Sequence, residues 1–306
     1  MDRPAPSGAD DLAERRSRIA ALPPLREVIA AADLAPKKSL GQHFLFDLNL
    51  TDKVARAARQ PGSPVDAPLL GETVVEVGPG PGGLTRSLLS AGATVIAVEK
   101  DQRALRALEP LAAAASGHLT LVSADALSVD WSTLAPQGAI ICANLPYNVA
   151  TPLIVGWLTA EPWPAWWKTA AVMVQREVGQ RLVAPPGRAD YGRLAVLAGW
   201  RTHASTAFDI APSAFVPPPK VWSSVIRLDP RPDAADIAAK ALSAVTAAAF
   251  GQRRKMLRSS LKSLPGEIAP EALLEAAGGL SPTARAEELS VENFIALAAA
   301  YTSLSG

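Results

Sequence analysis

Five short apolar segments, each followed by a polar or glycine-containing break and a longer amphipathic stretch, constrain the fold of this chain most strongly. They are rich in Val, Ile or Ala and have the length of strands. The segments are Thr73–Val77, Thr94–Glu99, Leu119–Val122, Ala139–Cys142 and Ala170–Val174. Strands that are buried on both faces read as near-continuous apolar runs, and helical connections make neighbouring strands parallel. The pattern therefore predicts an α/β fold in which helices cover both faces of a parallel sheet.

Two later apolar runs, Leu194–Trp200 and Ser223–Leu228, are predicted to complete this sheet as a hairpin across the proline-rich turn at 217–219. The composition changes near residue 230. From Ala234 to Ser305 the chain is rich in Ala and Leu at helical spacing, with breaks at Pro265-Gly266 and Gly278-Gly279. Three or four short helices packed as a small bundle are expected there.

These patterns divide the chain into three parts. Residues 1–36 form an N-terminal extension with one or two short helices, interrupted at Pro23-Pro24. Residues 37–230 form the α/β domain, and residues 231–306 form a small all-helical domain. The 306 residues are long enough for one large and one small domain.

Composition excludes several classes of function. Thirty basic and twenty-nine acidic residues leave a net charge of +1, so nucleic-acid binding requires local basic patches. The single cysteine, Cys142, excludes a disulfide framework, and the three histidines are too far apart for a helical zinc motif, so no metal is expected. The N-terminus lacks an apolar signal core and the apolar stretches are too short to span a bilayer. A cytoplasmic protein without a membrane partner is predicted.

A glycine-rich loop follows the first predicted strand and leads into a short helix that ends at Gly92. Glycines allow a sharp turn and a close approach of a ligand to main-chain amides. Gly78, Gly80 and Gly83 satisfy the G-x-G-x-x-G pattern, and Glu99 ends the next strand, 99 − 78 = 21 residues after Gly78. A carboxylate there can hold ribose hydroxyls. Dehydrogenases and methyltransferases both use this arrangement.

Two features favour a methyltransferase. Pro79 and Pro81 remove backbone donors that a pyrophosphate would need, and Glu76 suits a positively charged ligand such as a sulfonium better than a phosphate. Asp125, at the end of the third predicted strand, can accept a hydrogen bond from the exocyclic amine of a bound adenine. The alternative for Asp125 is a helix N-cap.

The segment Asn144-Leu145-Pro146-Tyr147 follows the fourth predicted strand, where ligands of open α/β sheets bind. An adenine amine is a poor nucleophile because its lone pair is delocalised into the ring. The Asn144 side-chain oxygen and the Leu145 carbonyl can accept hydrogen bonds from both N–H groups and free that lone pair. Pro146 biases Leu145 toward an extended backbone, and Tyr147 offers a ring for stacking of an extruded base. The segment predicts methylation of a base amine.

In combination, these motifs resemble the KsgA (RsmA) family of ribosomal RNA adenine dimethyltransferases, from about Leu34 onward. The resemblance also includes the segments 38–45, 215–221, 253–258 and 285–290. It implies a Rossmann-like class I methyltransferase fold with a seven-stranded sheet and a small C-terminal helical domain. It implies that S-adenosylmethionine supplies two methyl groups to each of two adjacent adenosines in the 3′-terminal hairpin loop of 16S rRNA, in the small ribosomal subunit or its precursor. The enzyme is expected to be a monomer.

The resemblance also implies roles for individual residues. Those expected at the cofactor are His43, Leu45, Gly78, Gly80, Glu99, Asp125 and Asn144. Those expected at the target base are Asn144, Leu145, Pro146, Tyr147 and Phe215, with Tyr147 and Phe215 stacking on the base. Many members carry asparagine where this chain has His43, which can still donate a hydrogen bond.

A basic run without acids, residues 251–263, is predicted to contact RNA phosphates. If this run is helical, Arg254 and Arg258 share one face, and Lys262 lies one turn further along. The predicted RNA-binding residues are Lys37, Lys38, Arg253, Arg254, Lys255, Arg258 and Lys262. Arginines 176, 181, 188 and 193 extend this set.

Three alternatives stay open at this point. A 23S rRNA adenine methyltransferase of the macrolide-resistance type would share the fold, but the basic run and residues 285–290 favour the small-subunit enzyme. An NAD-linked dehydrogenase would need a hydride-transfer acid or base, and no His or Lys stands at a suitable strand end. A non-catalytic ribosome assembly factor would have no need of the intact Asn144–Tyr147 segment.

Overall fold

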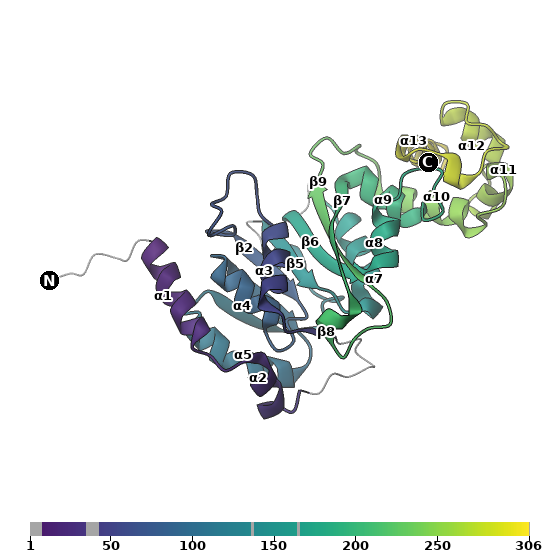
Figure 1. Ribbon diagram of the computed structural model, residues 1–306. Coiled ribbons are helices and arrows are strands. Elements are labelled where there is room, and N and C mark those ends of the chain that lie inside the picture. Colours follow the sequence, from purple (N-terminus) through teal and green to yellow (C-terminus); the bar gives the residue numbers. More distant parts are fainter. Residues whose placement is uncertain (1–7, 35–42, 136–137, 164–165, 306) are drawn as a thin grey trace. The chain divides into compact units, whose positions relative to one another are not determined.

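The computed structural model describes residues 8–34, 43–135, 138–163 and 166–305, and these contain a seven-stranded sheet (Figure 1). Its strands are β2 (Thr73–Val77), β3 (Thr94–Glu99), β4 (Leu119–Ser123), β5 (Ala139–Asn144), β6 (Trp167–Gln175), β7 (Thr202–Ile210) and β9 (Ser223–Pro230). The strand order is β4-β3-β2-β5-β6-β9-β7. The first five strands coincide with the five predicted segments within a few residues, which confirms the predicted α/β fold.

The middle of the sheet is parallel and apolar. Strand β2 pairs in parallel with β3 on one side and with β5 on the other, so the order of strand addition reverses at β2. Val74 and Val75 of β2 and Ile140 of β5 are fully buried. Ligands of open α/β sheets bind at such a reversal, beyond the carboxyl ends of the strands. A separate two-stranded pair, β1 (Phe44–Leu45) with β8 (Phe215–Val216), is antiparallel and aligns Leu45 with Phe215.

Helices connect the strands as the amphipathic stretches predict. They are α3 (Leu48–Ala57), α4 (Gly83–Ser90), α5 (Gln102–Ala114), α6 (Trp131–Leu134), α7 (Tyr147–Leu158), α8 (Arg176–Val183) and α9 (Arg193–Arg201). Aspartates at positions 47, 101 and 130 accept hydrogen bonds from the first backbone N–H groups of α3, α5 and α6. These N-caps define where the helices begin. The described residues also contain the short 3₁₀ helices η2 (Pro212–Ala214), η3 (Leu261–Ser263) and η4 (Ala286–Glu288).

The predicted strand at Leu194–Trp200 is wrong. This run forms helix α9, in which Ala195–Ala198 and Trp200 are buried. A short helix buried on most sides has the same continuous apolar pattern as a buried strand. The strand that completes the sheet is the following segment, the polar edge strand β7, which neighbours β9. The predicted Ser223–Leu228 strand is confirmed as part of β9, but its neighbour in the sheet is β7 and not the Leu194–Trp200 run of the predicted hairpin.

The N-terminal residues contain two helices, α1 (Gly8–Ala20) and α2 (Leu25–Ala31), separated at Pro23-Pro24 as predicted. Helix α1 contacts α4 and α5, beside which it lies in Figure 1. Arg16 Nε donates to the Ser90 carbonyl at the end of α4 over 2.7 Å, and Arg18 Nε donates to the Ala114 carbonyl at the end of α5 over 2.9 Å. Guanidinium groups satisfy carbonyls at the negative end of a helix dipole. These contacts attach α1 to the sheet-covering helices.

The C-terminal residues form the predicted short helices. They are α10 (Ala239–Gly251), α11 (Leu257–Ser260), α12 (Pro270–Ala276) and α13 (Val291–Ser305). Phe250 stacks on Phe294 with ring centroids 5.3 Å apart, which joins α10 to α13. Gly278 and Gly279 adopt positive φ angles of 96° and 73°, at the predicted break after α12.

By their contacts, the residues form two compact units. One consists of 1–153, 166–176 and 206–227, and the other of 154–165, 177–205 and 228–306. Helices α8 and α9 therefore group largely with the C-terminal helices. The sequence-based boundary near residue 230 stays a proposal about domains. Within the described part of the chain, none of the helices has the length and apolar character that a membrane crossing needs.

Residues 251–263 do not form one continuous helix, so the condition for a shared basic face is not met. Helix α10 ends at Gly251, turns follow, and α11 begins only at Leu257. Met256 forms a β-bridge with Arg285, and the Leu257 N–H donates to the Ala284 carbonyl over 2.8 Å. These contacts hold the chain out of the helical path. Arg254 and Arg258 therefore do not share a face of one helix.

Candidate active site

A single pocket at the carboxyl ends of β2, β3, β4 and β5 brings together the predicted cofactor residues. It lies within the first compact unit. Its lining includes His43, Leu45, Gly78, Gly80, Glu99, Asp125, Asn144, Leu145, Pro146 and Tyr147. These are all the residues predicted for the cofactor and all those predicted for the target base except Phe215. Segments that are as much as 147 − 43 = 104 residues apart in sequence thus meet where the strand order predicts a ligand.

The glycine loop has the backbone that the sequence pattern predicts. Gly78 and Gly80 have positive φ angles of 67° and 54°. A Cβ atom on Gly80 would lie 3.1 Å from the Phe44 ring, and one on Gly78 would lie 3.5 Å from Pro146. Glycine is required for the left-handed turn and leaves the floor of the pocket open.

The close packing around Gly82, which has φ +89°, leads to a stability prediction. A Cβ there would lie 2.7 Å from Leu108 Cδ2, so Gly82→Ala adds overpacking of about 1–3 kcal/mol to about 1–2 kcal/mol of left-handed strain. Gly117→Ala is the matched control, because Gly117 has φ +85° and nothing within 4 Å. Denaturant unfolding should show the larger loss for Gly82→Ala. Equal losses would mean that Leu108 moves aside without penalty.

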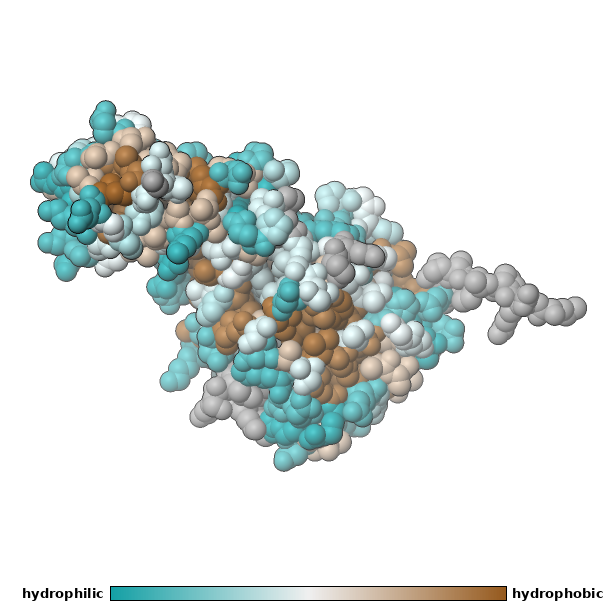
Figure 2. Space-filling model, turned by 180° about the vertical axis from the view of Figure 1, so that it is seen from behind, coloured by the Kyte–Doolittle hydropathy of each residue, from teal (hydrophilic) through white to brown (hydrophobic). Residues whose placement is uncertain are grey.

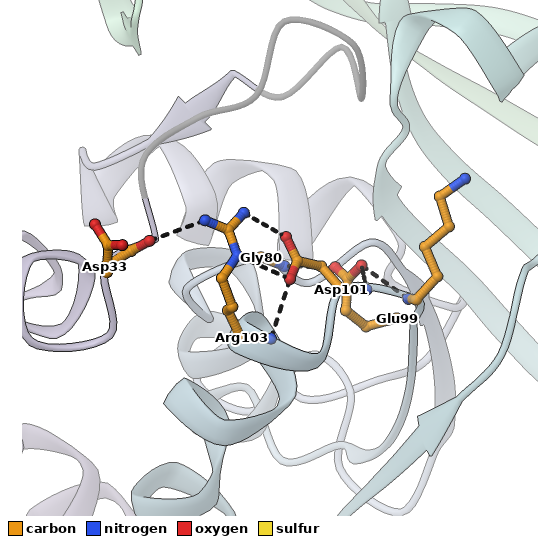
Figure 3. Close-up of polar contacts among 6 residues, drawn as sticks. Asp33, Gly80, Glu99, Asp101 and Arg103 are labelled. Carbon is orange, nitrogen blue, oxygen red and sulfur yellow. Dashed lines mark hydrogen bonds and ion pairs between the residues drawn. The ribbon is translucent and has the colours of Figure 1, made fainter.

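Glu99 ends β3 and is held in place by main-chain amides (Figure 3). Its Oε1 accepts from the N–H groups of Lys100 and Asp101, each over 2.9 Å, and its Oε2 accepts from Gly80 N–H over 3.4 Å. Burial raises the pKa of this carboxyl, and the three backbone donors oppose that rise. The turn behind it is fixed by Arg103, which binds the Asp101 carboxylate over 2.7 Å and the Asp33 carbonyl over 2.9 Å. The carboxylate therefore faces the pocket in a fixed orientation.

Asp125 lies on the rim of the pocket after β4. Its Oδ1 accepts from Leu127 N–H over 3.0 Å, and its Oδ2 lies 3.6 Å from Lys100 Nζ. The first contact closes a local turn, and since no helix of the described residues begins at Asp125, the helix N-cap alternative is wrong. With 47% of its side chain exposed, Asp125 also keeps oxygen surface for a ligand. The local turn and ligand binding are compatible in this geometry.

Glu76 is a buried carboxyl on the floor of the pocket. It is only 1% exposed and its Oε2 accepts from the Thr85 hydroxyl over 2.7 Å. Burial raises its pKa to about 8, an effect that the Thr85 hydrogen bond opposes and the nearby Glu99 increases. Removal of a carboxylate from water without a cation disfavours the charged form. The side chain is therefore largely protonated at neutral pH unless a positively charged ligand lies against it.

This raised pKa predicts a pH-dependent stability. In the folded chain Glu76 binds its proton more tightly than in the unfolded chain, so its contribution is complete below about pH 4.5 and is lost as pH rises through about 8. The rise in the pKa of Glu76 from 4.5 to about 8 corresponds to at most about 5 kcal/mol of unfolding free energy. Unfolding free energies of the wild type and Glu76→Gln, measured from pH 5 to 9, should diverge in favour of the variant as pH rises. A pH-independent difference would contradict this assignment.

The Asn144–Tyr147 segment turns directly from β5 into α7, and its side chains are fixed by neighbouring loops. Asn144 Nδ2 donates to the His43 carbonyl over 3.1 Å, and the Leu145 N–H donates to the Met173 carbonyl over 3.2 Å. The first bond orients the Asn144 amide with its oxygen directed away from His43. The Tyr147 hydroxyl bonds to the Ser223 hydroxyl over 2.6 Å, and its ring lies 5.4 Å from the His43 ring.

Phe215 does not line this pocket. It is 2% exposed and belongs to the core, where β8 pairs it with Leu45. A base cannot stack on this ring unless the β1–β8 pair moves, so the predicted stacking role stays a prediction. Burial in strand β8 depends on a long-range pairing that the local motif does not encode.

Several pocket residues were missed by the sequence patterns. The pocket is also lined by Thr51, Lys100, Asn148 and Met173. Thr85 donates its hydroxyl hydrogen bond to the Glu76 carboxyl. Lys100 follows Glu99 directly, which is the one available sequence signal. Thr51 and Met173 enter from α3 and β6, far along the chain, and only the fold identifies them.

The predicted RNA-binding residues of the second unit lie on its surface. Arg254, Lys255, Arg258 and Lys262 are exposed, whereas Arg253 is half-buried and pairs with Glu287 over 2.8 Å. Arg253 also donates to the Arg188 carbonyl over 3.2 Å. It therefore holds the turn after α10, and the other four are better placed to meet phosphates. Lys37 and Lys38 lie outside the described residues.

Comparison with known proteins identifies the family. The model of the family described as "Ribosomal RNA adenine dimethylase" matches residues 34–303. The chain is 59% identical over 280 residues to "Ribosomal RNA small subunit methyltransferase A" of Methylobacterium radiotolerans, covering 90% of this chain and 92% of that protein. It is 56% identical over 285 residues to the protein of the same name from Xanthobacter autotrophicus, covering 92% and 95%.

Solved structures agree on the fold. A dimethyladenosine transferase from Plasmodium falciparum superposes with a TM-score of 0.70 at 22% identity, covering 86% of this chain and 98% of that one. The 23S rRNA methyltransferase ErmE gives a TM-score of 0.59 at 24% identity, covering 84% and 98%. At these identities the two structures support the class I methyltransferase fold alone. The fold and family that the motifs predict are both confirmed. The chain is a methyltransferase that belongs to the ribosomal RNA adenine dimethylase family.

Proposed function

We propose that this enzyme uses S-adenosylmethionine to add two methyl groups to the exocyclic N6 amine of each of two adjacent adenosines in the 3′-terminal hairpin loop of 16S rRNA. The observation that carries the proposal is the position of Asn144–Tyr147 in the same pocket as Glu99 and Asp125. The names of the relatives at 56–59% identity support the small subunit as the source of the RNA. The likeness to ErmE is limited to the fold and gives no comparable support for 23S rRNA.

The residues of the pocket fit S-adenosylmethionine. Gly78 and Gly80 keep the floor of the pocket open, because a Cβ atom at either position would narrow the pocket. Glu99 Oε2 makes only a long hydrogen bond to Gly80 N–H and is available to ribose hydroxyls. Asp125 can accept from an adenine amine at the rim. Glu76 has no cationic partner among the described contacts, and it can face the charged methionine end. When bound, the cofactor supplies an electrophilic methyl group.

The target amine would be held by two acceptors from consecutive residues. The Asn144 amide is oriented by its bond to the His43 carbonyl, so that Oδ1 accepts from one N–H of the adenine amine. The Leu145 carbonyl accepts from the other. Both bonds draw the nitrogen toward tetrahedral geometry and direct its lone pair at the methyl group. Tyr147, anchored by Ser223, offers its ring to the base.

The reaction requires little proton chemistry from the protein. The amine becomes a stronger acid once it carries the new methyl group, and it can release its proton to water. Tyr147 does not serve as the base, because burial raises the pKa of its hydroxyl and that hydroxyl is bonded to Ser223. The rate enhancement in this account comes from positioning and polarisation.

The same proposal includes how the enzyme acts in the cell. The pocket of one chain holds all the predicted cofactor residues and all the predicted target residues except Phe215, so a monomer suffices. A substrate within the small ribosomal subunit or its precursor places the enzyme in the cytoplasm.

The proposal is tested by transfer of a labelled methyl group. The protein is incubated with labelled S-adenosylmethionine and with separate small and large subunits from cells that lack the modification. Label in small-subunit RNA is expected. Label in large-subunit RNA would support the resistance-type activity instead, and a chain that binds subunits without transferring label would be an assembly factor.

A further inference from the structure

A loop between β8 and β9, residues 217–222, is held at both ends by hydrogen bonds to residues that line the pocket. At its start, the Pro217 carbonyl lies 2.8 Å from His43 Nδ1. Immediately after its end, the Ser223 hydroxyl bonds to the Tyr147 hydroxyl over 2.6 Å. Both His43 and Tyr147 line the pocket. The loop is therefore held beside the position proposed for the target base. We call residues 217–222 the proline loop.

The proline loop displays a large aromatic side chain. Trp222 is 44% exposed, and its neighbour Val221 is 43% exposed. The Arg176 guanidinium lies over the Trp222 ring, 5.8 Å from its centroid. The backbone N–H of Arg176 donates a hydrogen bond to the backbone carbonyl of Trp222 over 2.9 Å. The indole is thus held by a cation–π contact and a backbone bond while nearly half of the residue stays open to solvent.

Exposure alone does not mark a site, since Figure 2 shows hydrophobic residues gathered in patches on the face that it presents. The second observation is that Trp222 directly precedes Ser223, whose hydroxyl bonds to Tyr147 of the pocket. Charge is the third, because Lys220 and Arg176 are both exposed and the proline loop carries no acidic residue. An aromatic ring among cations suits a nucleic acid strand, whose bases stack and whose phosphates are anionic.

We propose that Trp222 stacks on an unpaired nucleobase that neighbours the target adenosine in the RNA. This inference rests on the proposed function. An adenosine that is extruded into the pocket leaves its neighbour without a stacking partner, and an aromatic ring at the mouth replaces that partner. Arg176 occupies one side of the indole, and the base occupies the exposed side. Trp222 acts as a specificity-determining contact and does not touch the reacting atoms.

Substitutions in the full-length protein test this role on small-subunit methylation. Trp222→Ala is expected to lower kcat/KM about tenfold, mainly through KM, which is the size expected for one lost base–aromatic stack. Trp222→Phe should keep most of the activity, and Trp222→Leu should resemble Trp222→Ala because leucine is apolar but cannot stack. Val221→Ala, on the adjacent exposed residue, is the matched control. Unchanged thermal unfolding and S-adenosylmethionine affinity will show that the variants are folded.

The RNA side provides an independent measurement. Small subunits are reconstituted with an abasic residue in place of each unpaired neighbour of the target, one at a time. At one position the abasic residue should lower kcat/KM for the wild type about as much as Trp222→Ala lowers it for intact RNA. Trp222→Ala acting on that abasic RNA should lose little more. Full activity of Trp222→Leu, or additive losses at every position, would overturn the inference. Absence of methylation by the wild type would instead overturn the proposed function.

Discussion

Asn144→Ala is expected to lower kcat for methyl transfer by about 10²–10⁴-fold while weakening cofactor binding only modestly. The side-chain oxygen is proposed to accept a hydrogen bond that strengthens as the amine nitrogen becomes tetrahedral. Loss of one such oriented group lowers kcat by about 10²–10³-fold in other enzymes. The variant also loses the Nδ2 bond to the His43 carbonyl, which adds disorder at the mouth of the pocket. Single-turnover methylation and equilibrium cofactor binding separate the two effects.

Asn148→Ala is the matched control for this variant. Asn148 lines the same pocket, is exposed and is the second residue of α7, but it is not placed to meet the target amine. We expect its kcat to stay within a few fold of the wild type. Normal turnover by Asn144→Ala would remove the chemical basis of the proposed mechanism, and equal losses in both variants would point to general damage of the turn.

The second large effect is expected from reversal of the basic surface. Arg254→Glu combined with Arg258→Glu should weaken binding to the small subunit about 10²-fold at moderate ionic strength. The slope of log affinity against log salt should fall by about two, because two phosphate contacts and their released counterions are lost. Both side chains are exposed, so their replacement leaves the core of the helical unit intact. Affinity for S-adenosylmethionine should not change.

A control with the same change in net charge separates local contact from general attraction. Arg56→Glu combined with Arg106→Glu reverses two exposed arginines on α3 and α5, outside the helical unit. Binding by this control should weaken far less than binding by the Arg254/Arg258 variant. Equal weakening would show that total charge, and not the surface after α10, governs association with the subunit.

The candidate site could be predicted from sequence because strand ends carry strong local signals. Glu99, Asp125 and Asn144 each follow an apolar run, and parallel strands place such residues at one edge of a sheet. The glycine loop was also predictable, since its φ angles require glycine. The proposed roles of Asn144 and Leu145 follow from the chemistry of an amine nucleophile.

Features that depend on distant contacts could not be predicted. The apolar run in α9 resembles a strand because that helix is buried on most sides, and the true strand β7 is polar because it is at an edge. The basic run after Gly251 is not one helix, because Met256 forms a β-bridge with Arg285. Phe215 is likewise buried because β8 pairs it with Leu45, which lies far earlier in the sequence. In each case a tertiary contact overrides the local pattern.

Mass spectrometry of the methylated RNA tests the central claim most directly. Small subunits that lack the modification are incubated with the enzyme and S-adenosylmethionine, and the 3′-terminal fragment of 16S rRNA is isolated and sequenced by mass. The proposed function predicts two adjacent adenosines that each carry two methyl groups on N6. The Asn144→Ala sample should show neither. Methyl groups on ribose or on another base of this fragment, or no methylation of it at all, would contradict the account.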